Sequence, residues 1–175
     1  MIHFLDQKLY HISEEPNISS FRPRLDRNGN MSVWAISAHR VQNYLLPRNC
    51  PRICVWAGEK TNEQDRHKLR HANSIIAIER AWFERAESTP LFAYMFDSDG
   101  FEIEDANAGY FTSNQDQIPE DVQEIDDPLR HLNRLGTRLE VLEELHSFKE
   151  TILSSSFAFS MIRMRNAAPI QPTQT

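Results

Sequence analysis

The residues of this chain best suited to chemistry begin with the tetrapeptide Tyr10-His11-Ile12-Ser13. We predict that a short strand ends here, because a polar loop broken by Pro16 follows it. Side chains two positions apart point to one face of a strand, so His11 and Ser13 share a face. An imidazole and a hydroxyl on one face can hold a ribose diol or a carboxamide. The alternative is a histidine satisfied at a strand edge, with Ser13 capping the turn.

Arginines form three short pairs at the ends of predicted segments. A planar guanidinium binds phosphate or carboxylate through two parallel hydrogen bonds. If the pairs converge, they form a pocket for a phosphorylated ligand. The alternative is a set of salt bridges to some of the 25 acidic residues. The pairs are Arg22 with Arg24, Arg48 with Arg52, and Arg163 with Arg165.

A tyrosine stands near the end of the next helix that the sequence predicts. Residues 32–37 are expected to form a strand, Ser37 to cap a helix over 38–46, and Pro47 to end it. At that position, Tyr44 can lie flat over a planar ligand ring. The alternative is that Tyr44, with Leu45 and Leu46, packs the helix on the sheet.

These features together resemble the ADP-ribosyltransferase-like superfamily. There, a first strand carries a Tyr-His-x-Ser/Thr motif, and a later strand and helix supply a tyrosine. The resemblance implies that His11 and Ser13 hold the ribose of NAD and that Tyr44 stacks on the nicotinamide. The RNA 2'-phosphotransferase branch of the superfamily also uses arginines beside its histidine. The implied activity is transfer of ADP-ribose or of a phosphate-linked group. A non-catalytic ligand-binding or interaction domain is the alternative.

The superfamily also places a third catalytic residue, usually glutamate, near a late strand. The matching region here runs from Tyr110 to Glu120, and no glutamate stands at the expected position. Gln115, Asp116 and Gln117 are the residues that could substitute, and Gln117 is the candidate carried forward.

A second resemblance spans nearly the whole chain, to a family of small bacterial proteins of unknown function. It is carried by a Tyr-His-x-Ser-x-x-Pro opening, by the segment from Tyr44 to Arg52, by a Gly-Tyr strand, and by the ending from Ile162 to Ala167. This resemblance brings no activity with it.

Composition sets the broad class. The chain has 175 residues, of which 40% are hydrophobic, so we expect one domain over 1–168 and a flexible tail over 169–175. The net charge of -6 argues against a general nucleic-acid surface. We expect no membrane span and no signal peptide. Two closely spaced cysteines, Cys50 and Cys54, favour a reducing cytoplasm. The expected ligand is a small nucleotide, and the sequence leaves the oligomeric state open.

The predicted elements indicate an α+β domain with a mixed, largely antiparallel sheet and short flanking helices. Residues 61–71 are either a surface helix or a lid-like loop. An i, i+4 histidine pair within them, His67 and His71, lies near Asp65, but no third strong ligand follows, so no metal site is predicted. The last strand is expected over 157–165, with one face passing from core residues to Arg163 and Arg165. The other expected strands are 8–13, 53–57, 74–78, 91–96, 101–104, 109–113 and 138–142, and the other helices 79–87, 128–135 and 147–154.

Overall fold

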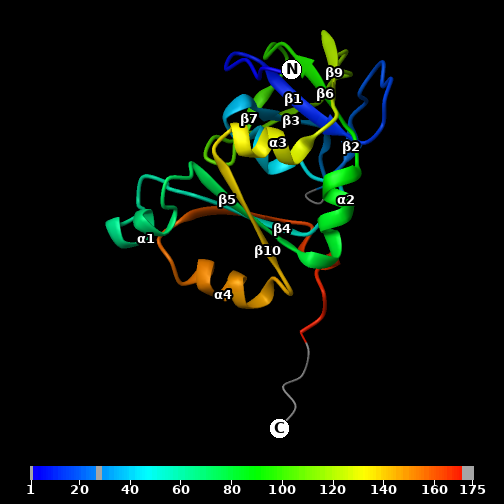
Figure 1. Cartoon of the computed structure of the whole chain (residues 1–175). Coiled ribbons are helices and arrows are strands. Elements are labelled where there is room, and N and C mark those ends of the chain that lie inside the picture. The colour runs from blue at the N-terminus through cyan, green and yellow to red at the C-terminus, as the bar shows by residue number, and fades with distance from the viewer. Residues whose placement is uncertain (1, 27–28, 171–175) are drawn as a thin grey trace. The chain divides into compact units, whose positions relative to one another are not determined.

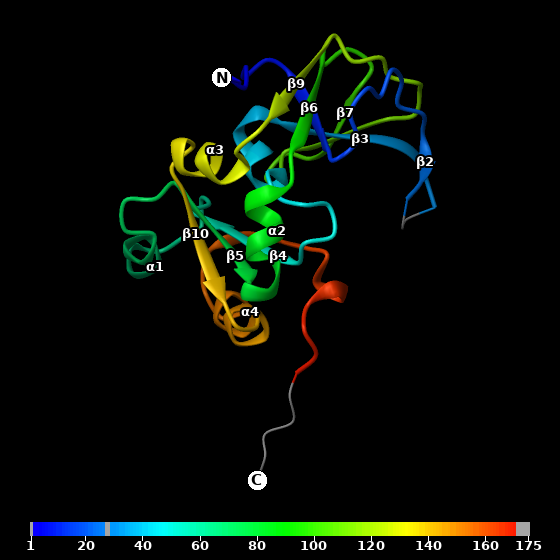
Figure 2. The ribbon, with the colours of Figure 1, turned by 45° about the vertical axis from the view of Figure 1, so that its right-hand side comes forward.

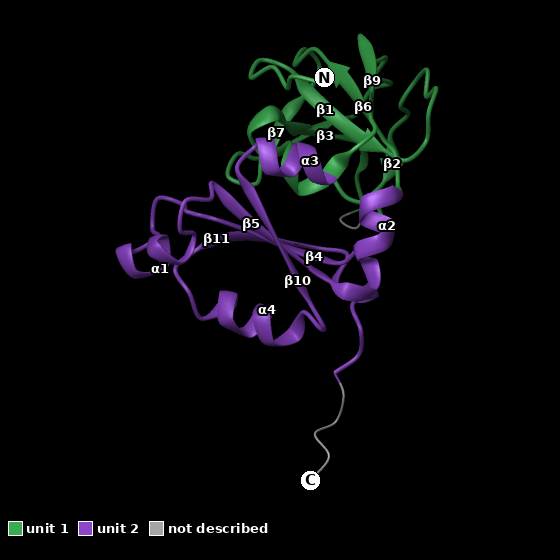
Figure 3. Cartoon of the chain, viewed as in Figure 1, with its two compact units in different colours: residues 1–48, 89–128 green, residues 49–88, 129–175 purple. Residues whose placement is uncertain are grey.

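The computed structural model describes residues 2–26 and 29–170. The chain divides into two compact units (Figure 3). Unit 1 consists of residues 1–48 and 89–128, and unit 2 of residues 49–88 and 129–175. The chain therefore leaves each unit and returns to it. A single domain over 1–168 stays a prediction.

Unit 1 is built on a seven-stranded antiparallel sheet in the order β7-β8-β3-β1-β6-β9, with β2 paired to β3 (Figure 1). A 3₁₀ helix, η1 (Ala38–Tyr44), follows β3. The strands are β1 (Leu9–Ser13), β2 (Arg24–Leu25), β3 (Met31–Ser37), β6 (Leu91–Phe96), β7 (Glu102–Asp105), β8 (Tyr110–Ser113) and β9 (Asp121–Ile125).

The two faces of this sheet follow from the strand register. His11 pairs with Tyr94, and Tyr10 pairs with Met95 on one side and Ile36 on the other. Because neighbouring residues of a strand point to opposite faces, His11 shares its face with Tyr94, and Tyr10 points to the other face. The His11 face carries a buried apolar cluster, which Phe21 and other rings cover. The cluster consists of Leu9, Ala35, Tyr94 and Phe96.

Unit 2 contains a four-stranded sheet in the order β10-β5-β4-β11, in which only β10 and β5 are parallel. In both ribbon views α4 lies along this sheet (Figures 1 and 2). The elements are β4 (Arg52–Trp56), α1 (Glu63–Lys68), β5 (Ser74–Glu79), η2 (Arg80–Trp82), α2 (Phe83–Ser88), α3 (Pro128–Arg134, whose first residue belongs to unit 1), β10 (Thr137–Leu142), α4 (His146–Leu153), β11 (Ala158–Ile162) and η3 (Met164–Asn166).

The two central strands of the unit 2 sheet, β4 and β5, have apolar sequences because both of their faces are covered. All residues of β4 and β5 are buried. A strand covered on both faces reads as a continuous apolar run, as in Ile53-Cys54-Val55-Trp56 and Ile75-Ile76-Ala77-Ile78. One face of the sheet joins Val55 and Ile75 to Ile152 of α4 and to Phe157 in a buried core.

The structure confirms the α+β class, the mostly antiparallel pairing and the short helices. The expected helix over 38–46 is instead the 3₁₀ helix η1, and the helix expected over 79–87 begins as the 3₁₀ turn η2. The strands β2 and β9 were not predicted. Of the described residues, none forms a helix long and apolar enough to cross a membrane.

One expectation was wrong in a way that affects site residues. The strand expected over 157–165 stops at Ile162, because Arg163 adopts a left-handed backbone with φ of 55°. Arg163 and Arg165 therefore do not continue the face of β11. The helix α1 ends at Lys68, and Arg70 has φ of 55°, so His67 and His71 do not share one helix face. The last part of the expected flexible tail, residues 171–175, lies outside the described residues.

Candidate functional site

The His11 imidazole is held by a backbone carbonyl of the neighbouring strand. Its Nδ1 lies 2.9 Å from the carbonyl oxygen of Trp34. A carbonyl oxygen only accepts hydrogen bonds, so Nδ1 must carry the proton. The paired residues of β1 and β3 extend only to Tyr10 and Ile36, so the imidazole bonds to β3 where the regular pairing has stopped.

The protonation state of His11 follows from its surroundings. Burial lowers the pKa of the imidazole, the hydrogen bond to Trp34 raises it, and the positive charges of Arg48 and Arg24 lower it further. The net shift is downward, so His11 is neutral at pH 7. With Nδ1 protonated, the Nε2 atom of the neutral ring keeps its lone pair and can accept a hydrogen bond.

Phe21 connects His11 to Gln117, the candidate for the third catalytic residue. The Phe21 ring centroid lies 4.7 Å from that of His11 and 5.1 Å from that of Tyr94. The Phe21 backbone forms an isolated antiparallel bridge with Gln117, with N–H to carbonyl distances of 2.8 and 2.9 Å. Gln117 therefore lies beside the residue that packs on the His11 ring. Its side-chain amide donates to the Ser113 hydroxyl at 2.8 Å.

Ser13 ends β1 on the His11 face. Its hydroxyl oxygen accepts a hydrogen bond from the Glu15 amide at 3.0 Å. This is the turn-capping role expected of Ser13 as the alternative to ligand binding. The hydroxyl proton is not used in that bond, so Ser13 can cap the turn and still donate to a ligand.

Two of the unit 1 arginines lie near enough to His11 to act on its charge. Arg24 lies in β2, Arg48 follows η1 and Pro47, and both lower the His11 pKa through their charges. The Arg48 backbone N–H donates to a carboxylate oxygen of Glu14 at 2.7 Å, which ties it to the end of β1. These contacts place positive charge around the imidazole.

Arg22, which forms a pair with Arg24 in the sequence, is used differently. The Arg22 side chain is 83% exposed, and its Nε lies 3.8 Å from an Asp116 carboxylate oxygen. An exposed pair at this distance contributes little to stability. Arg22 therefore fits the salt-bridge alternative.

The remaining members of the three predicted arginine pairs belong to unit 2. Arg52 is 2% exposed, and its Nη1 donates to the Cys50 carbonyl at 3.1 Å. Arg163 precedes η3, and Arg165 lies within it. The three pairs are divided between the two units, and their convergence on one pocket stays a prediction.

Tyr44 is not brought next to His11 within unit 1. Its ring centroid lies 6.3 Å from that of Tyr110, in an edge-on arrangement at 74°. Tyr110 pairs with Ile36, and its ring also contacts Trp34. The register puts Ile36 and Tyr110 on the sheet face opposite His11. Tyr44 thus packs in an aromatic cluster there.

The sequence patterns did not identify two residues that contact the His11 ring, Trp34 and Phe21. Trp34 acts through its main-chain carbonyl, which carries no side-chain signal. Phe21 reaches His11 only because the loop after β1 folds back over the sheet, where Tyr94 donates to the Glu15 carbonyl and accepts from the Ile18 amide. No local pattern predicts that return.

The cysteines do not supply a nucleophile. Both are free and buried. Burial raises the pKa of the Cys50 thiol to about 11 and that of Cys54 to about 12. Thiols with such values stay protonated near neutral pH and react slowly. Within the described part of the chain, no three His, Cys, Asp or Glu residues gather as metal ligands.

The fold defines an α+β protein with two sheets and a half-buried histidine presented by an antiparallel sheet. A family model matches residues 10–167, and the chain belongs to that family, the family of unknown function DUF6886. The match covers the opening motif, the Tyr44–Arg52 segment and the closing motif on which the resemblance to a family of unknown function was based. No curated protein and no solved structure matches the chain.

Proposed function

We propose that unit 1 binds a phosphorylated nucleotide, NAD or a related molecule, at His11. The observation that carries this proposal is the hydrogen bond from His11 Nδ1 to the Trp34 carbonyl. It sets the tautomer, and the lowered pKa keeps the ring neutral, so Nε2 is an acceptor for a ribose hydroxyl. The same atom on a cationic ring would be a donor.

The charges around His11 fit an anionic ligand. Arg24 and Arg48 both act electrostatically on the imidazole, and both residues are exposed. Guanidinium groups bind phosphate oxygens bidentately, which adds geometric selectivity to the attraction. In this proposal His11 and Ser13 hold the ribose, and Arg24 and Arg48 hold the phosphates.

Group transfer is the second candidate function. The lone pair of His11 Nε2 supports it, because an uncharged imidazole can take a proton from an attacking hydroxyl. The reaction would be of the ADP-ribosyltransferase or RNA 2'-phosphotransferase type. Gln117 favours binding without turnover, because a neutral amide cannot supply the negative charge of the superfamily's glutamate. The position of Tyr44 on the opposite sheet face favours binding alone as well.

Isothermal titration of the full chain with NAD, ADP-ribose, AMP and inorganic phosphate tests binding. We expect saturable binding of at least one nucleotide, which Arg24→Gln and Arg48→Gln each weaken about tenfold or more, the effect of losing one charge-assisted bond. Arg22→Gln is the matched control, because Arg22 lies on the same segment as Arg24 but pairs with Asp116. Equal losses in all three variants, or no binding to any ligand, would refute the proposal.

A second assay separates the two candidate functions. Incubation with NAD, followed by chromatography of nicotinamide and ADP-ribose, detects cleavage. Binding that depends on the arginines, without nicotinamide release, supports the binding module. Release that His11→Asn abolishes supports a transferase. For a phosphotransferase, the substrate is an RNA carrying a 2'-phosphate, and the readout is loss of that phosphate.

The cellular setting also belongs to this proposal. We propose a cytoplasmic protein of bacterial origin. The two buried free thiols support a reducing compartment, in which such cysteines persist unpaired. Mass spectrometry of the alkylated protein from cells tests this, because a Cys50–Cys54 disulfide would contradict it.

A further inference from the structure

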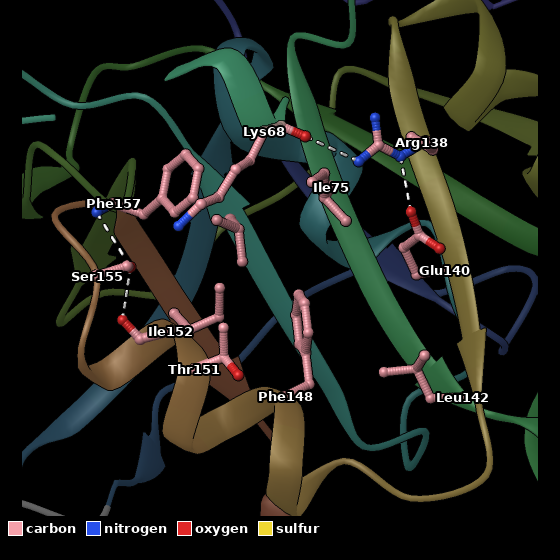
Figure 4. Close-up of a pocket in the computed structure, with 11 residues that line it drawn as sticks. Lys68, Ile75, Arg138, Glu140, Leu142, Phe148, Thr151, Ile152, Ser155 and Phe157 are labelled. Atoms are coloured by element: carbon pink, nitrogen blue, oxygen red, sulfur yellow. Dashed lines mark hydrogen bonds and ion pairs between the residues drawn. The ribbon is translucent and has the colours of Figure 1, made fainter. Parts of the chain in front are cut away.

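Unit 2 holds a pocket between its sheet and α4, separate from the residues of the His11 site. Its volume is about 200 Å³. Val55 and Ile75, paired on neighbouring strands, form its floor, and Phe148 and Ile152 of α4 form the opposite wall (Figure 4). Phe157 and Leu142 close the two sides. All six of these side chains are apolar.

The charged residues that line the pocket come from α1 and β10. Arg138, Glu140 and Leu142 share one face of β10, because they are two residues apart. Toward one end of the pocket the Lys68 ammonium points to Phe157, and the Arg138 guanidinium meets the main-chain carbonyl of Lys68; Leu142 and Phe148 lie at the other end (Figure 4). The pocket is therefore apolar along its length and charged at one end.

Arg138 is held in place by its own hydrogen bonds. Its Nε donates to Glu140 at 2.7 Å, and its Nη atoms donate to the carbonyls of Leu69 and Lys68 at 2.8 and 3.2 Å. The guanidinium therefore caps the end of α1 and stays at the pocket end as a fixed positive charge.

The Lys68 ammonium has more N–H donors than its bond to Asp65 uses. Its side chain is 54% exposed, and its Nζ lies 2.6 Å from a carboxylate oxygen of Asp65. An ammonium has three N–H donors, so one bond to Asp65 leaves two. Asp65 also accepts from the Ser156 amide and hydroxyl, each at 2.7 Å. Asp65 therefore stays hydrogen-bonded when the flexible lysine turns toward a ligand.

The size of the pocket and the N–H donors of Lys68 together define the ligand class. A cavity of roughly 150 Å³ lined by apolar side chains holds one benzene ring, and drug-sized ligands need about 300 Å³ or more. A pocket of about 200 Å³ accepts one ring and a small substituent. The Lys68–Asp65 and Arg138–Glu140 ion pairs sum to zero net charge, and the two N–H donors that Lys68 keeps match the two oxygens of one carboxylate. We propose that unit 2 binds a small aryl carboxylate, with its ring against Phe148 and Ile152 and its carboxylate at Lys68.

Three ligands of similar size and different charge test whether the pocket prefers an anion. NMR titration of the isotope-labelled full chain measures the affinity of each. Phenylacetate carries the anion, phenylacetamide is neutral, and phenethylamine is cationic. A ligand of about ten non-hydrogen atoms is expected to bind with a Kd on the order of 1 mM. We expect phenylacetate to bind about tenfold tighter than the amide, the amine to bind weakest, and the Val55 and Ile152 amides to shift.

Two variants and a control test the location. Lys68→Gln should remove the preference for the anion and keep the affinity for the amide. Thr151→Phe places a ring at the pocket from an exposed helix position and should abolish binding of both ligands. Lys60→Gln, at an exposed position outside the pocket, should change neither. Equal affinity for the amide, an unchanged preference in Lys68→Gln, or shifts only outside unit 2 would overturn the proposal. The absence of any shift at about 10 mM ligand, ten times the expected Kd, would also overturn it.

Discussion

Removing one hydroxyl oxygen from Tyr94 should loosen the loop that covers His11. The Tyr94 side chain is fully buried, and its hydroxyl makes two bonds to that loop. It accepts from the Ile18 amide at 3.0 Å and donates to the Glu15 carbonyl at 2.7 Å. Tyr94→Phe keeps the ring and loses both bonds. At about 1 kcal/mol for each bond, the free energy of unfolding should fall by about 2 kcal/mol.

The chain offers a matched control for this change. Tyr10 is also buried, at 2% exposure, and its hydroxyl makes one such bond, accepting from the Leu5 amide at 2.7 Å. Tyr10→Phe should therefore cost about 1 kcal/mol, half the cost of the Tyr94 change. Both variants lose the same atom from the same type of residue, so the difference between them measures the extra bond.

Urea denaturation followed by circular dichroism gives the two free energies. Hydrogen exchange adds a residue-specific readout, because the Ile18 amide should lose protection in Tyr94→Phe and keep it in Tyr10→Phe. If Tyr94→Phe costs no more than Tyr10→Phe, or if the Ile18 amide stays protected, the Tyr94 hydroxyl does not hold the loop.

Three further predictions follow from other parts of the chain. Hydrogen bonds from Lys68 and then Ser156 hold the pKa of Asp65 below its ordinary value, so the contribution of this carboxylate to stability is complete above about pH 5 and is lost as the pH falls further. Acid denaturation of Asp65→Asn should lack that pH-dependent loss. Burial raises the pKa of Cys54 to about 12, so a thiol reagent at pH 8 should label it in urea and leave it unlabelled in the native protein; fast native labelling would contradict this. Gly109 has φ of 71°, and a Cβ there would lie 2.5 Å from a serine hydroxyl oxygen, so Gly109→Ala should lower the free energy of unfolding by about 2 kcal/mol or more, measured in urea; a smaller loss would mean that the turn relaxes.

The strands were the most predictable part of the fold. Leu91–Phe96 was expected with the same limits that the structure shows, and Leu9–Ser13 within one residue. Apolar runs and alternation are local properties, so they can be detected in a single sequence. The division into two sheets was not predicted, because the partners of a strand come from distant parts of the chain. The pairing of β10 with β5, for example, joins segments about 60 residues apart.

For the candidate site, the sequence determined which residues have suitable chemistry, and the tertiary structure decided which of them meet. His11 was identified from residue types and spacing, and Gln117 from its place in the region resembling the superfamily. Their common neighbour Phe21 was not, because a bridge between residues about 100 positions apart has no local signal. Tyr44 has the right type but packs on the opposite face, because the strand register, and not the order along the chain, sets which side chains share a surface.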